Sequence, residues 1–266
     1  MTKIHPTAII EDGAIIGDDV EIGPYCLIGR QVTLGDRVRL SGHVAVDGHT
    51  SIGEGTLIYP FASIGHPPQH LGYHGEDTTL VIGKNNIIRE HVTMNPGTVQ
   101  GRGETSVGDD GLFMAASHIA HDCKVGNNVV FANNATLGGH VNVGDFVFIS
   151  GLSAVHQFTR IGRYSFVGGM AGLEGDLIPY GMCLGNRAAL TGLNVIGMKR
   201  RKLSREIIHA LRAAYRMLFA QEGTMQERIE DVKELFAEHE EVMEIIDFIK
   251  ADSNRPLCTP KADRGL

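Results

Sequence analysis

An aliphatic residue recurs at every sixth position along most of this chain, and this period constrains the fold more than any other feature. The first series occupies eleven successive sixth positions, from residue 4 to residue 64. The same register returns over residues 82–94 and again over residues 107–173. A small or β-branched residue usually lies four positions after each aliphatic residue, and glycine often follows the aliphatic residue directly. The repeating unit is therefore a hexapeptide.

A six-residue period fits neither an α-helix nor an alternating hairpin, but it fits a parallel β-helix. Three hexapeptides then form one triangular coil of 18 residues, and each short strand points its aliphatic side chain inward. Glycine, at 34 of 266 residues, and Asn or Asp supply the corners, where φ is often positive. Residues 18 apart stack one strand spacing, about 4.8 Å, above each other. We expect a mainly β domain of this kind over residues 1–178.

Two breaks in the register, at residues 65–81 and 100–106, indicate loops that leave the coil. Such insertions in a regular solenoid are more often functional or interfacial than tolerated surface excursions. Residues 179–203 contain Gly and Pro and are interpreted as a connecting segment. Helical periodicity then predicts a C-terminal domain over residues 204–250, with helices at 205–221, 224–238 and 241–250. Ser204 is the expected first cap, and Thr224 with Glu227 forms a capping box. Residues 251–266 are interrupted by proline and are expected to form a loose tail.

The composition excludes several classes of protein. The hydrophobic fraction of 42% supports a large core, and a net charge of −7 argues against general nucleic-acid binding. The N-terminus has no signal-peptide pattern, and no apolar stretch is long enough to span a membrane, so we expect a cytoplasmic protein without a stable membrane anchor. The four cysteines, Cys26, Cys123, Cys183 and Cys258, show no paired spacing. Cys26 and Cys123 occupy small-residue positions of the repeat and are interpreted as core residues.

A cluster of histidines lies in the longest series of repeats. It comprises His118, His121, His140 and His156, with Asp122 beside His121. His140 follows Asp122 by 18 residues, so the fold places it one coil directly above that carboxylate. We expect the titratable side chains to converge on one edge of the coil.

The residues alone leave three interpretations of this cluster open. A carboxylate beside His121 would favour one tautomer and make the imidazole a general base, while the glycines before His140 could offer a backbone N–H to an oxyanion. Alternatively, three histidines could ligate a divalent metal, as in zinc hydratases built on this type of solenoid. The third interpretation is a purely structural histidine ladder.

A local basic segment stands out in this acidic chain. Residues 199–216 contain seven Lys or Arg and one Glu, a net charge of +6. The segment could face an acidic partner, or it could be a solvated helix face. Phosphate binding by Arg200 and Arg201 is the more specific alternative.

Several motifs resemble those of the bacterial UDP-N-acetylglucosamine O-acyltransferases, which catalyse the first step of lipid A biosynthesis. They are HPTA at 5–8, HVAVDGHT at 43–50, IAHDC at 119–123, ANNATLGGHV at 132–141, AVHQF at 154–158 and GLNVIGMKRR at 192–201. The resemblance implies a homotrimer of left-handed β-helices with active sites between neighbouring chains. It also implies transfer of a 3-hydroxyacyl group from acyl carrier protein to the 3-hydroxyl of UDP-N-acetylglucosamine. No metal and no cofactor beyond the carrier-bound 3-hydroxyacyl phosphopantetheine is expected.

The resemblance assigns roles to individual residues. His121 would be the general base, Asp122 would orient it, and the Gly139 N–H would bind the oxyanion. The expected substrate-binding residues are Gln69, His118, His140, Gly151, His156, Gln157, Arg187, Asn194, Arg200 and Arg201. Gly169 stands where the family limits acyl length, which predicts a long chain of about 14 carbons or more because glycine leaves the cleft open.

The chain departs from the family pattern at two positions. Gly72 stands where many members have lysine, and Ile196 stands where they have an acidic residue. His70 and His74 are candidates to replace the lysine. Some relatives acylate a 3-amino sugar and form an amide, and the sequence does not separate that acceptor from the hydroxyl.

Overall fold

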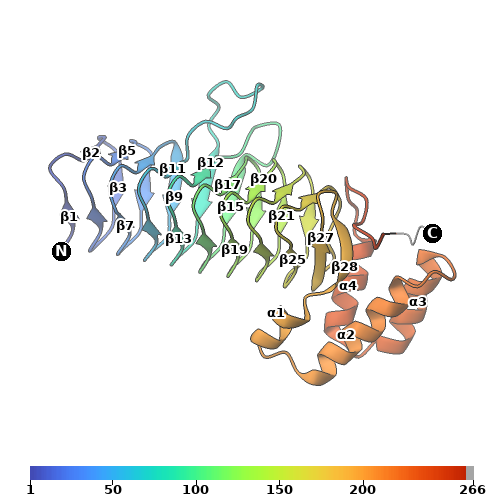
Figure 1. Ribbon diagram of the computed structural model, residues 1–266. Helices are drawn as coiled ribbons and strands as arrows, with labels where there is room; N and C mark the ends of the chain where they lie inside the picture. The colour runs from blue at the N-terminus through green and yellow to red at the C-terminus, as the bar shows by residue number, and fades with distance from the viewer. Residues whose placement is uncertain (262–266) are drawn as a thin grey trace.

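The computed structural model describes residues 1–261, in which short parallel strands stack into a long prism followed by four helices (Figure 1). The strands form three sheets, here called A, B and C. Sheet A contains β1 (Lys3–Ile4), β4 (Glu21–Ile22), β7 (Arg39–Leu40), β10 (Leu57–Ile58), β13 (Ile87–Ile88), β16 (Leu112–Phe113), β19 (Val130–Phe131), β22 (Phe148–Ile149), β25 (Phe166–Val167), β27 (Gly181–Leu184) and β28 (Ala189–Leu193). Sheet B contains β2 (Ile9–Ile10), β5 (Leu27–Ile28), β8 (Ala45–Val46), β11 (Ser63–Ile64), β14 (Thr93–Met94), β17 (His118–Ile119), β20 (Thr136–Leu137), β23 (Ala154–Val155) and β26 (Gly172–Leu173). Sheet C contains β3 (Ile15–Ile16), β6 (Thr33–Leu34), β9 (His49–Ile52), β12 (Thr79–Ile82), β15 (Glu104–Val107), β18 (Lys124–Val125), β21 (Asn142–Val143) and β24 (Arg160–Ile161).

The strand register follows the hexapeptide period, so the predicted β-helix is confirmed. In sheet B, Ile119 pairs with Leu137 and Leu137 pairs with Val155, which are successive 18-residue steps. These aliphatic side chains point into the prism and are at most 3% exposed. Cys26 and Cys123 are also fully buried in this core, as predicted.

The three corners of the prism hold L-residues in the left-handed region. At the B–C corner, Asp122, His140 and Phe158 have φ values of 61°, 62° and 66°. This conformation costs about 1–2 kcal/mol per residue, and main-chain hydrogen bonds between coils offset the cost. The His140 N–H donates to the His121 carbonyl at 3.0 Å, and the Phe158 N–H donates to the Gly139 carbonyl at 3.0 Å. The corner therefore stacks its side chains in a fixed column.

Both expected loops leave the prism at the B–C corner (Figure 1). The first runs from β11 to β12 and the second from β14 to β15, so they are shorter at their C-terminal ends than the sequence indicated. Residues 79–81 belong to β12, and residues 104–106 belong to β15. The extended strands keep one hydrogen-bonded register with β9, as Thr79 pairs with His49 and Glu104 with Thr79.

Four helices follow the sheets: α1 (Val195–Arg200), α2 (Arg205–Leu218), α3 (Met225–Phe236) and α4 (Glu240–Lys250). Ser204 caps α2, and Thr224 with Glu227 forms the predicted capping box of α3. The sequence did not predict α1 or the antiparallel pairing of β27 with β28, which together occupy the expected connecting segment. No helix in the described residues is long and apolar enough to cross a membrane.

The expectation of a loose tail is wrong for residues 251–261. The backbone of Asp176 accepts a hydrogen bond from Cys258 N–H and donates one to the Pro256 carbonyl, both at 2.8 Å. The Leu190 N–H donates to the Thr259 carbonyl at 3.0 Å. These backbone bonds lay the segment against the last coil, because the end of the prism offers unpaired N–H and C=O groups. Residues 262–266 lie outside the described residues.

Candidate active site

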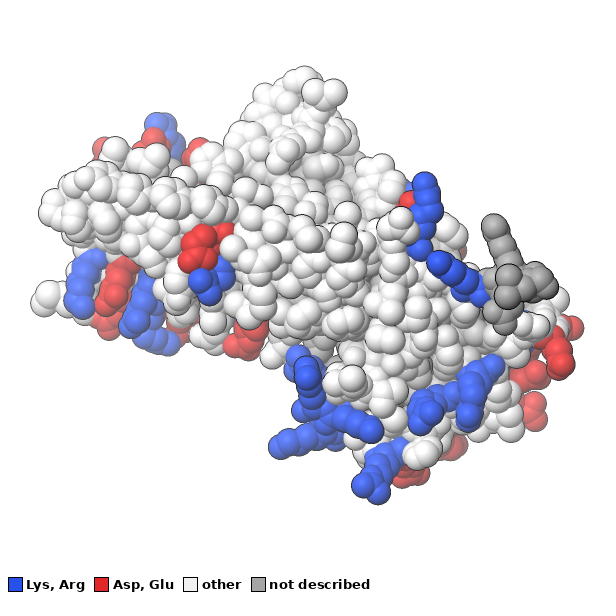
Figure 2. Space-filling model, in the orientation of Figure 1, with Lys and Arg blue, Asp and Glu red and all other residues white. Residues whose placement is uncertain are grey.

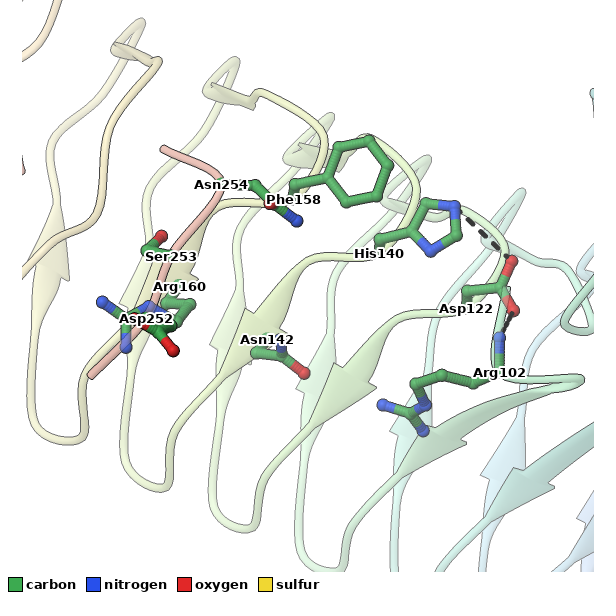
Figure 3. A pocket seen from close by; sticks show the side chains of 9 residues that line it. All are labelled: Arg102, Asp122, His140, Asn142, Phe158, Arg160, Asp252, Ser253 and Asn254. Atoms are coloured by element: carbon green, nitrogen blue, oxygen red, sulfur yellow. Dashed lines mark hydrogen bonds and ion pairs between the residues drawn. The ribbon is translucent and has the colours of Figure 1, made fainter. Parts of the chain in front are cut away.

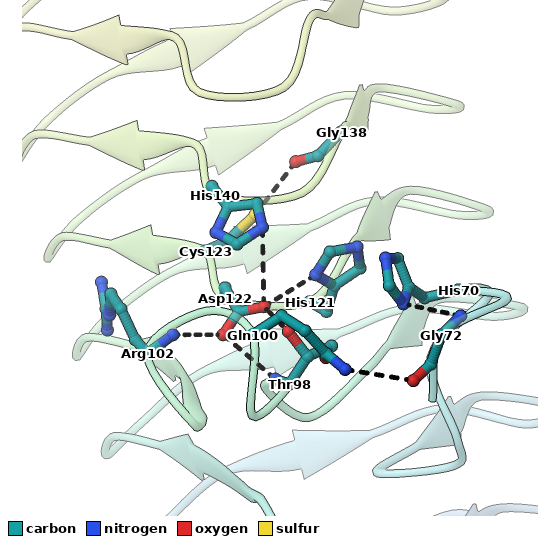
Figure 4. Close-up of polar contacts among 10 residues, drawn as sticks. All are labelled: His70, Gly72, Thr98, Gln100, Arg102, His121, Asp122, Cys123, Gly138 and His140. Carbon is teal, nitrogen blue, oxygen red and sulfur yellow. Dashed lines mark hydrogen bonds and ion pairs between the residues drawn. The ribbon is translucent and has the colours of Figure 1, made fainter. Parts of the chain in front are cut away.

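A buried carboxylate organises the histidine cluster at the B–C corner (Figure 4). Asp122 is 1% exposed, and its Oδ2 lies 2.8 Å from His121 Nδ1. His140 Nε2 lies 3.8 Å from the same oxygen, which confirms that His140 stands one coil above Asp122. Since an ionised carboxylate only accepts hydrogen bonds, Nδ1 of His121 donates and Nε2 is left free.

The second loop supplies the other partners of Asp122. The Thr98 hydroxyl donates to Oδ2 at 2.7 Å, while the N–H groups of Thr98 and Arg102 donate to Oδ1 at 3.0 and 2.7 Å. The loop comes so close at Gly101 that a Cβ there would lie 2.3 Å from the carboxylate. Glycine is therefore required for the loop to wrap around Asp122.

Burial and hydrogen bonding act in opposite directions on Asp122. Burial raises the pKa of the carboxyl, but the bonds from Thr98, His121 and the Arg102 N–H outweigh it, so the pKa is lowered from its ordinary value. Asp122 is thus an anion at neutral pH and holds the His121 ring by a charge-assisted hydrogen bond.

The two flanking histidines are held in the neutral form. Burial lowers the pKa of His118, and His121 nearby adds to the effect. Burial also lowers the pKa of His140, and the charge of Asp122 offsets only part of this. The Thr93 hydroxyl lies 2.7 Å from His118 Nδ1 and fixes that ring on the outer face of sheet B. Neutral imidazoles of this kind can donate or accept hydrogen bonds to a polar ligand.

Gly139 lies directly against the His121 ring. A Cβ at this position would come within 2.6–3.1 Å of three ring atoms, so no larger residue fits. Within residues 1–261 the Gly139 N–H has no hydrogen-bond partner. A free N–H beside an oriented imidazole is the arrangement that acyl transfer requires of an oxyanion donor.

The first loop also contacts the His121 ring. The rings of His70 and His121 meet edge to face with centroids 4.9 Å apart. Gln100 of the second loop donates to the Gly72 carbonyl at 3.2 Å and ties the two loops together (Figure 4). Gln69, beside His70, is exposed. Both loops therefore contribute to the site, whereas the repeats alone would leave it open.

A cation could also fit this cluster. Ligand atoms of His121, Asp122 and His140 lie within 4.8 Å of one another. Two imidazoles and a carboxylate are suitable ligands for zinc. The geometry is thus compatible with a metal site as well as with a general base, but its ligand set includes Asp122 where the sequence suggested a third histidine.

A hollow of about 580 Å³ continues from Asp122 and His140 toward the C-terminus (Figure 3). It lies between the B–C corner and residues 252–254, and Phe158, Arg160, Asn142 and Arg102 complete its lining. The ring of Phe158 stacks on His140 with centroids 4.4 Å apart. The corner column thus extends two coils beyond Asp122.

His156 is not part of the His121–Asp122–His140 cluster. In the described chain it makes no hydrogen bond or ring contact with the other three histidines, and it contacts Arg255 instead. Gln157 is exposed, and its carbonyl also accepts from Arg255. His156 directly follows β23 at the B–C corner, as its spacing predicts, but its ring contacts the C-terminal segment, so its part in the expected convergence along this edge stays a prediction.

The other predicted residues lie on different corners. Asn194 caps α1, accepting from Gly197 N–H at 3.0 Å and donating to the Tyr164 carbonyl at 2.8 Å, so both ends of its amide are engaged. The Arg201 guanidinium lies 4.2 Å from the centre of the Phe146 ring at the C–A corner. Arg200 is exposed beside it, as Figure 2 shows for the Lys and Arg side chains gathered around α1 and α2.

Three further predicted residues lie near the C-terminal end of the prism. Gly151 and Gly169 lie at the A–B corner, one coil apart, and a Cβ on Gly169 would have its nearest contact at 3.7 Å. Arg187 is exposed and pairs with Glu174 at 2.9 Å. The structure thus does not bring these residues next to His121 within one chain.

Sequence reasoning missed Thr93, Thr98, Arg102 and Arg255. The break in the register near residue 100 was the only signal for Thr98 and Arg102. Thr93 could have been found by register, because it pairs with His118 across β14 and β17. No repeat position indicated Arg255.

The fold and the site together define a class: a hexapeptide-repeat transferase with an oriented histidine at a loop-covered corner. Residues 13–48 match the description "Bacterial transferase hexapeptide (six repeats)", and residues 176–258 match "Udp N-acetylglucosamine O-acyltransferase; Domain 2". The chain belongs to the acyl-[acyl-carrier-protein]–UDP-N-acetylglucosamine O-acyltransferase family, as the following relatives show.

The acyltransferase of that name from Caulobacter vibrioides is 59% identical over 80% of this chain and 81% of its own length. That from Rhizobium etli is 50% identical over 97% of this chain and 95% of its own length. Among solved structures, the UDP-N-acetylglucosamine O-acyltransferase of Moraxella catarrhalis superposes with a TM-score of 0.93 at 44% identity, covering 96% of this chain and 99% of that one.

The lowered pKa of Asp122 makes a prediction about stability. Its stabilising contribution is fully present above the ordinary pKa near 3.8 and is lost as the pH falls through the lowered value in the folded protein. Asp122→Asn should therefore lower the free energy of unfolding by about 1–3 kcal/mol at pH 7, and this difference should shrink below about pH 4. Denaturant titrations at several pH values measure it, with the exposed Asp12→Asn as control. A difference that stays constant down to pH 3 would contradict the assignment.

Proposed function

We propose that this chain transfers a 3-hydroxyacyl group from acyl carrier protein to the 3-hydroxyl of UDP-N-acetylglucosamine, with His121 as general base. The observation that carries the proposal is the 2.8 Å contact between His121 Nδ1 and the buried Asp122 carboxylate, beside a Gly139 N–H that has no partner within residues 1–261. Membership of a family whose curated relatives carry this activity in their names supports the substrates.

In the proposed reaction His121 Nε2 takes the proton of the sugar 3-hydroxyl as its oxygen attacks the thioester carbonyl. Asp122 stabilises the imidazolium that results, and the Gly139 N–H binds the oxyanion of the tetrahedral intermediate. When the intermediate collapses, the C–S bond breaks and His121 returns the proton to the thiolate of the phosphopantetheine arm. Atoms and charge balance without a metal or a redox cofactor, so we propose that the enzyme uses neither.

We propose a homotrimer with shared active sites. Arg201 and the α1 cap residue Asn194 lie at the C–A corner, and a full strand of sheet C separates them from His121 at the B–C corner. A neighbouring chain could present its C–A corner to the His121 site.

Apolar side chains on the outside of sheet A support this packing. They include Leu57, Ile87, Leu112, Val130, Phe148 and Phe166. A ring column of Tyr25, His43, Phe61 and His91, with successive centroids 5.0–5.2 Å apart, continues it along the A–B corner. A row of partly exposed apolar side chains along one face is typical of an interface between subunits.

The remaining predicted roles concern binding of the carrier protein, the sugar nucleotide and the acyl chain. The basic surface around α1 and α2, which includes Arg200, suits an acidic carrier protein. His118, His140, Gly151, His156 and Gln157 are proposed to line the sugar and acyl pocket. Gln69, Arg187, Asn194 and Arg201 are proposed to contact the nucleotide or the phosphopantetheine arm.

Product analysis tests the activity directly. The native enzyme should form an ester from UDP-N-acetylglucosamine and 3-hydroxymyristoyl carrier protein, detected by mass spectrometry. His121→Ala should lower the rate by at least about 100-fold, because it removes the general base, while the exposed His5→Ala should not. An active His121→Ala variant would contradict the general-base role.

The other outcomes of that assay separate the alternatives. An amide formed only with a 3-amino analogue of the sugar would keep the mechanism and change the acceptor. No product with either sugar, together with near-stoichiometric zinc in the purified protein, would favour the metal interpretation of His121, Asp122 and His140.

Gly169 makes the acyl-length proposal testable. The open space around its Cβ position leaves room for a longer side chain, so Gly169→Met should shorten the cleft. The native enzyme should prefer a fourteen-carbon donor over a ten-carbon donor, since each buried CH₂ contributes about 0.8 kcal/mol. Gly169→Met should reverse the preference and Gly169→Ala should change it less, as judged by kcat/KM for the two donors. A native enzyme that uses the ten-carbon donor equally fast would contradict the proposal.

A further inference from the structure

The column of backbone hydrogen bonds at the B–C corner is interrupted one coil above Gly139. In the first two of these hydrogen bonds, His140 N–H donates to the His121 carbonyl and Phe158 N–H donates to the Gly139 carbonyl, each at 3.0 Å. By the same 18-residue step, Asp176 N–H would donate to the Gln157 carbonyl. Asp176 N–H donates instead to the Pro256 carbonyl at 2.8 Å, so the Gln157 carbonyl loses its backbone partner.

The Arg255 side chain takes the place of the missing backbone donor at the Gln157 carbonyl. Its Nε donates to the Gln157 carbonyl at 2.8 Å, and its terminal NH₂ group contacts Nδ1 of His156. A guanidinium only donates hydrogen bonds, so Nδ1 of His156 must accept one. The proton of the neutral His156 ring then lies on Nε2. One arginine thus fixes both the backbone of Gln157 and the tautomer of His156.

The C-terminal segment holds Arg255 in place. The Arg255 N–H donates to the Ser253 hydroxyl at 3.1 Å, and three residues further on Cys258 N–H donates to the Asp176 carbonyl at 2.8 Å. Figure 3 shows residues 252–254 running beside the corner at Phe158. Arg255 therefore approaches the corner from a segment that is tied to the prism directly after it, where Asp176 bonds with Pro256 and Cys258.

We propose that Arg255 is a positioning residue for the acyl-donor side of the active site. This inference rests on the proposed function. The column rises from His121, which receives the proton of the acceptor, to Gly139, which faces the thioester carbonyl, and then to Gln157. The coil that Arg255 supports is therefore the next one on the donor side. Without the guanidinium, the Gln157 carbonyl keeps, within the described residues, only the 3.4 Å contact with Nδ1 of His156, and that ring is then free to take the other tautomer.

Steady-state kinetics with both substrates test this role. Arg255→Ala should raise KM for the acyl carrier protein donor about 5- to 10-fold, as expected for one charge-assisted hydrogen bond. KM for the sugar nucleotide and the melting temperature should change little. Arg255→Lys should restore part of the donor KM, because lysine keeps the charge and can donate to one of the two acceptors. Arg30→Ala is the matched control, since Arg30 is exposed near the N-terminal end of the same corner and pairs only with Glu11.

Each outcome decides the proposal. Equal increases in both KM values with a lower melting temperature, and no rescue by lysine, would reduce Arg255 to a structural residue and overturn it. An unchanged donor KM in an active enzyme would also overturn it while leaving the proposed function intact. A native enzyme that forms no ester would overturn the proposed function and this inference with it.

Discussion

The site depends on one buried anion, the carboxylate of Asp122. It lies at a left-handed corner, is 1% exposed and accepts hydrogen bonds from His121 and from the second loop. A buried charge without such partners would cost several kcal/mol. The same bonds that make the carboxylate tolerable therefore fix the His121 ring and fold the loop around Gly101. Orientation of the His121 ring and closure of the second loop over the site both follow from the hydrogen bonds that this one charge requires.

In the β-helix, the spacing of residues in the sequence determines their position along the axis of the prism. Because each coil adds 18 residues, His121, Gly139 and Gln157 occupy successive levels of the same corner, and the proposed substrates would meet them in this order. Residues 252–258 return to this column, where Arg255 donates to the Gln157 carbonyl in place of a backbone N–H. Residues 252–254 thus line the same hollow as Asp122 and His140, although they are distant in sequence.

The prism and the placement of His140 above Asp122 could be predicted because they follow from a strict period. Ser204 and Thr224 could be predicted as caps because capping is local. The loop contacts of Thr98 and Arg102 could not, since loops have no period. Arg255 could not be found because its partner lies 98 residues away and its segment has no repeat pattern. The contact of His156 with Arg255 could not be predicted for the same reason: spacing places a residue on a corner but does not say which neighbour its side chain contacts.

Asp122 orients the His121 ring, and the protonation of the two His121 ring nitrogens tests this orientation directly. Nitrogen NMR of selectively labelled histidine, assigned by comparison with His121→Gln, distinguishes the two neutral tautomers. We expect a proton on Nδ1 and an unprotonated Nε2 at the pH where the enzyme is active, because Asp122 accepts from Nδ1. A proton on Nε2 with a free Nδ1 would contradict it, since His121 could then not accept the proton of the sugar hydroxyl through Nε2.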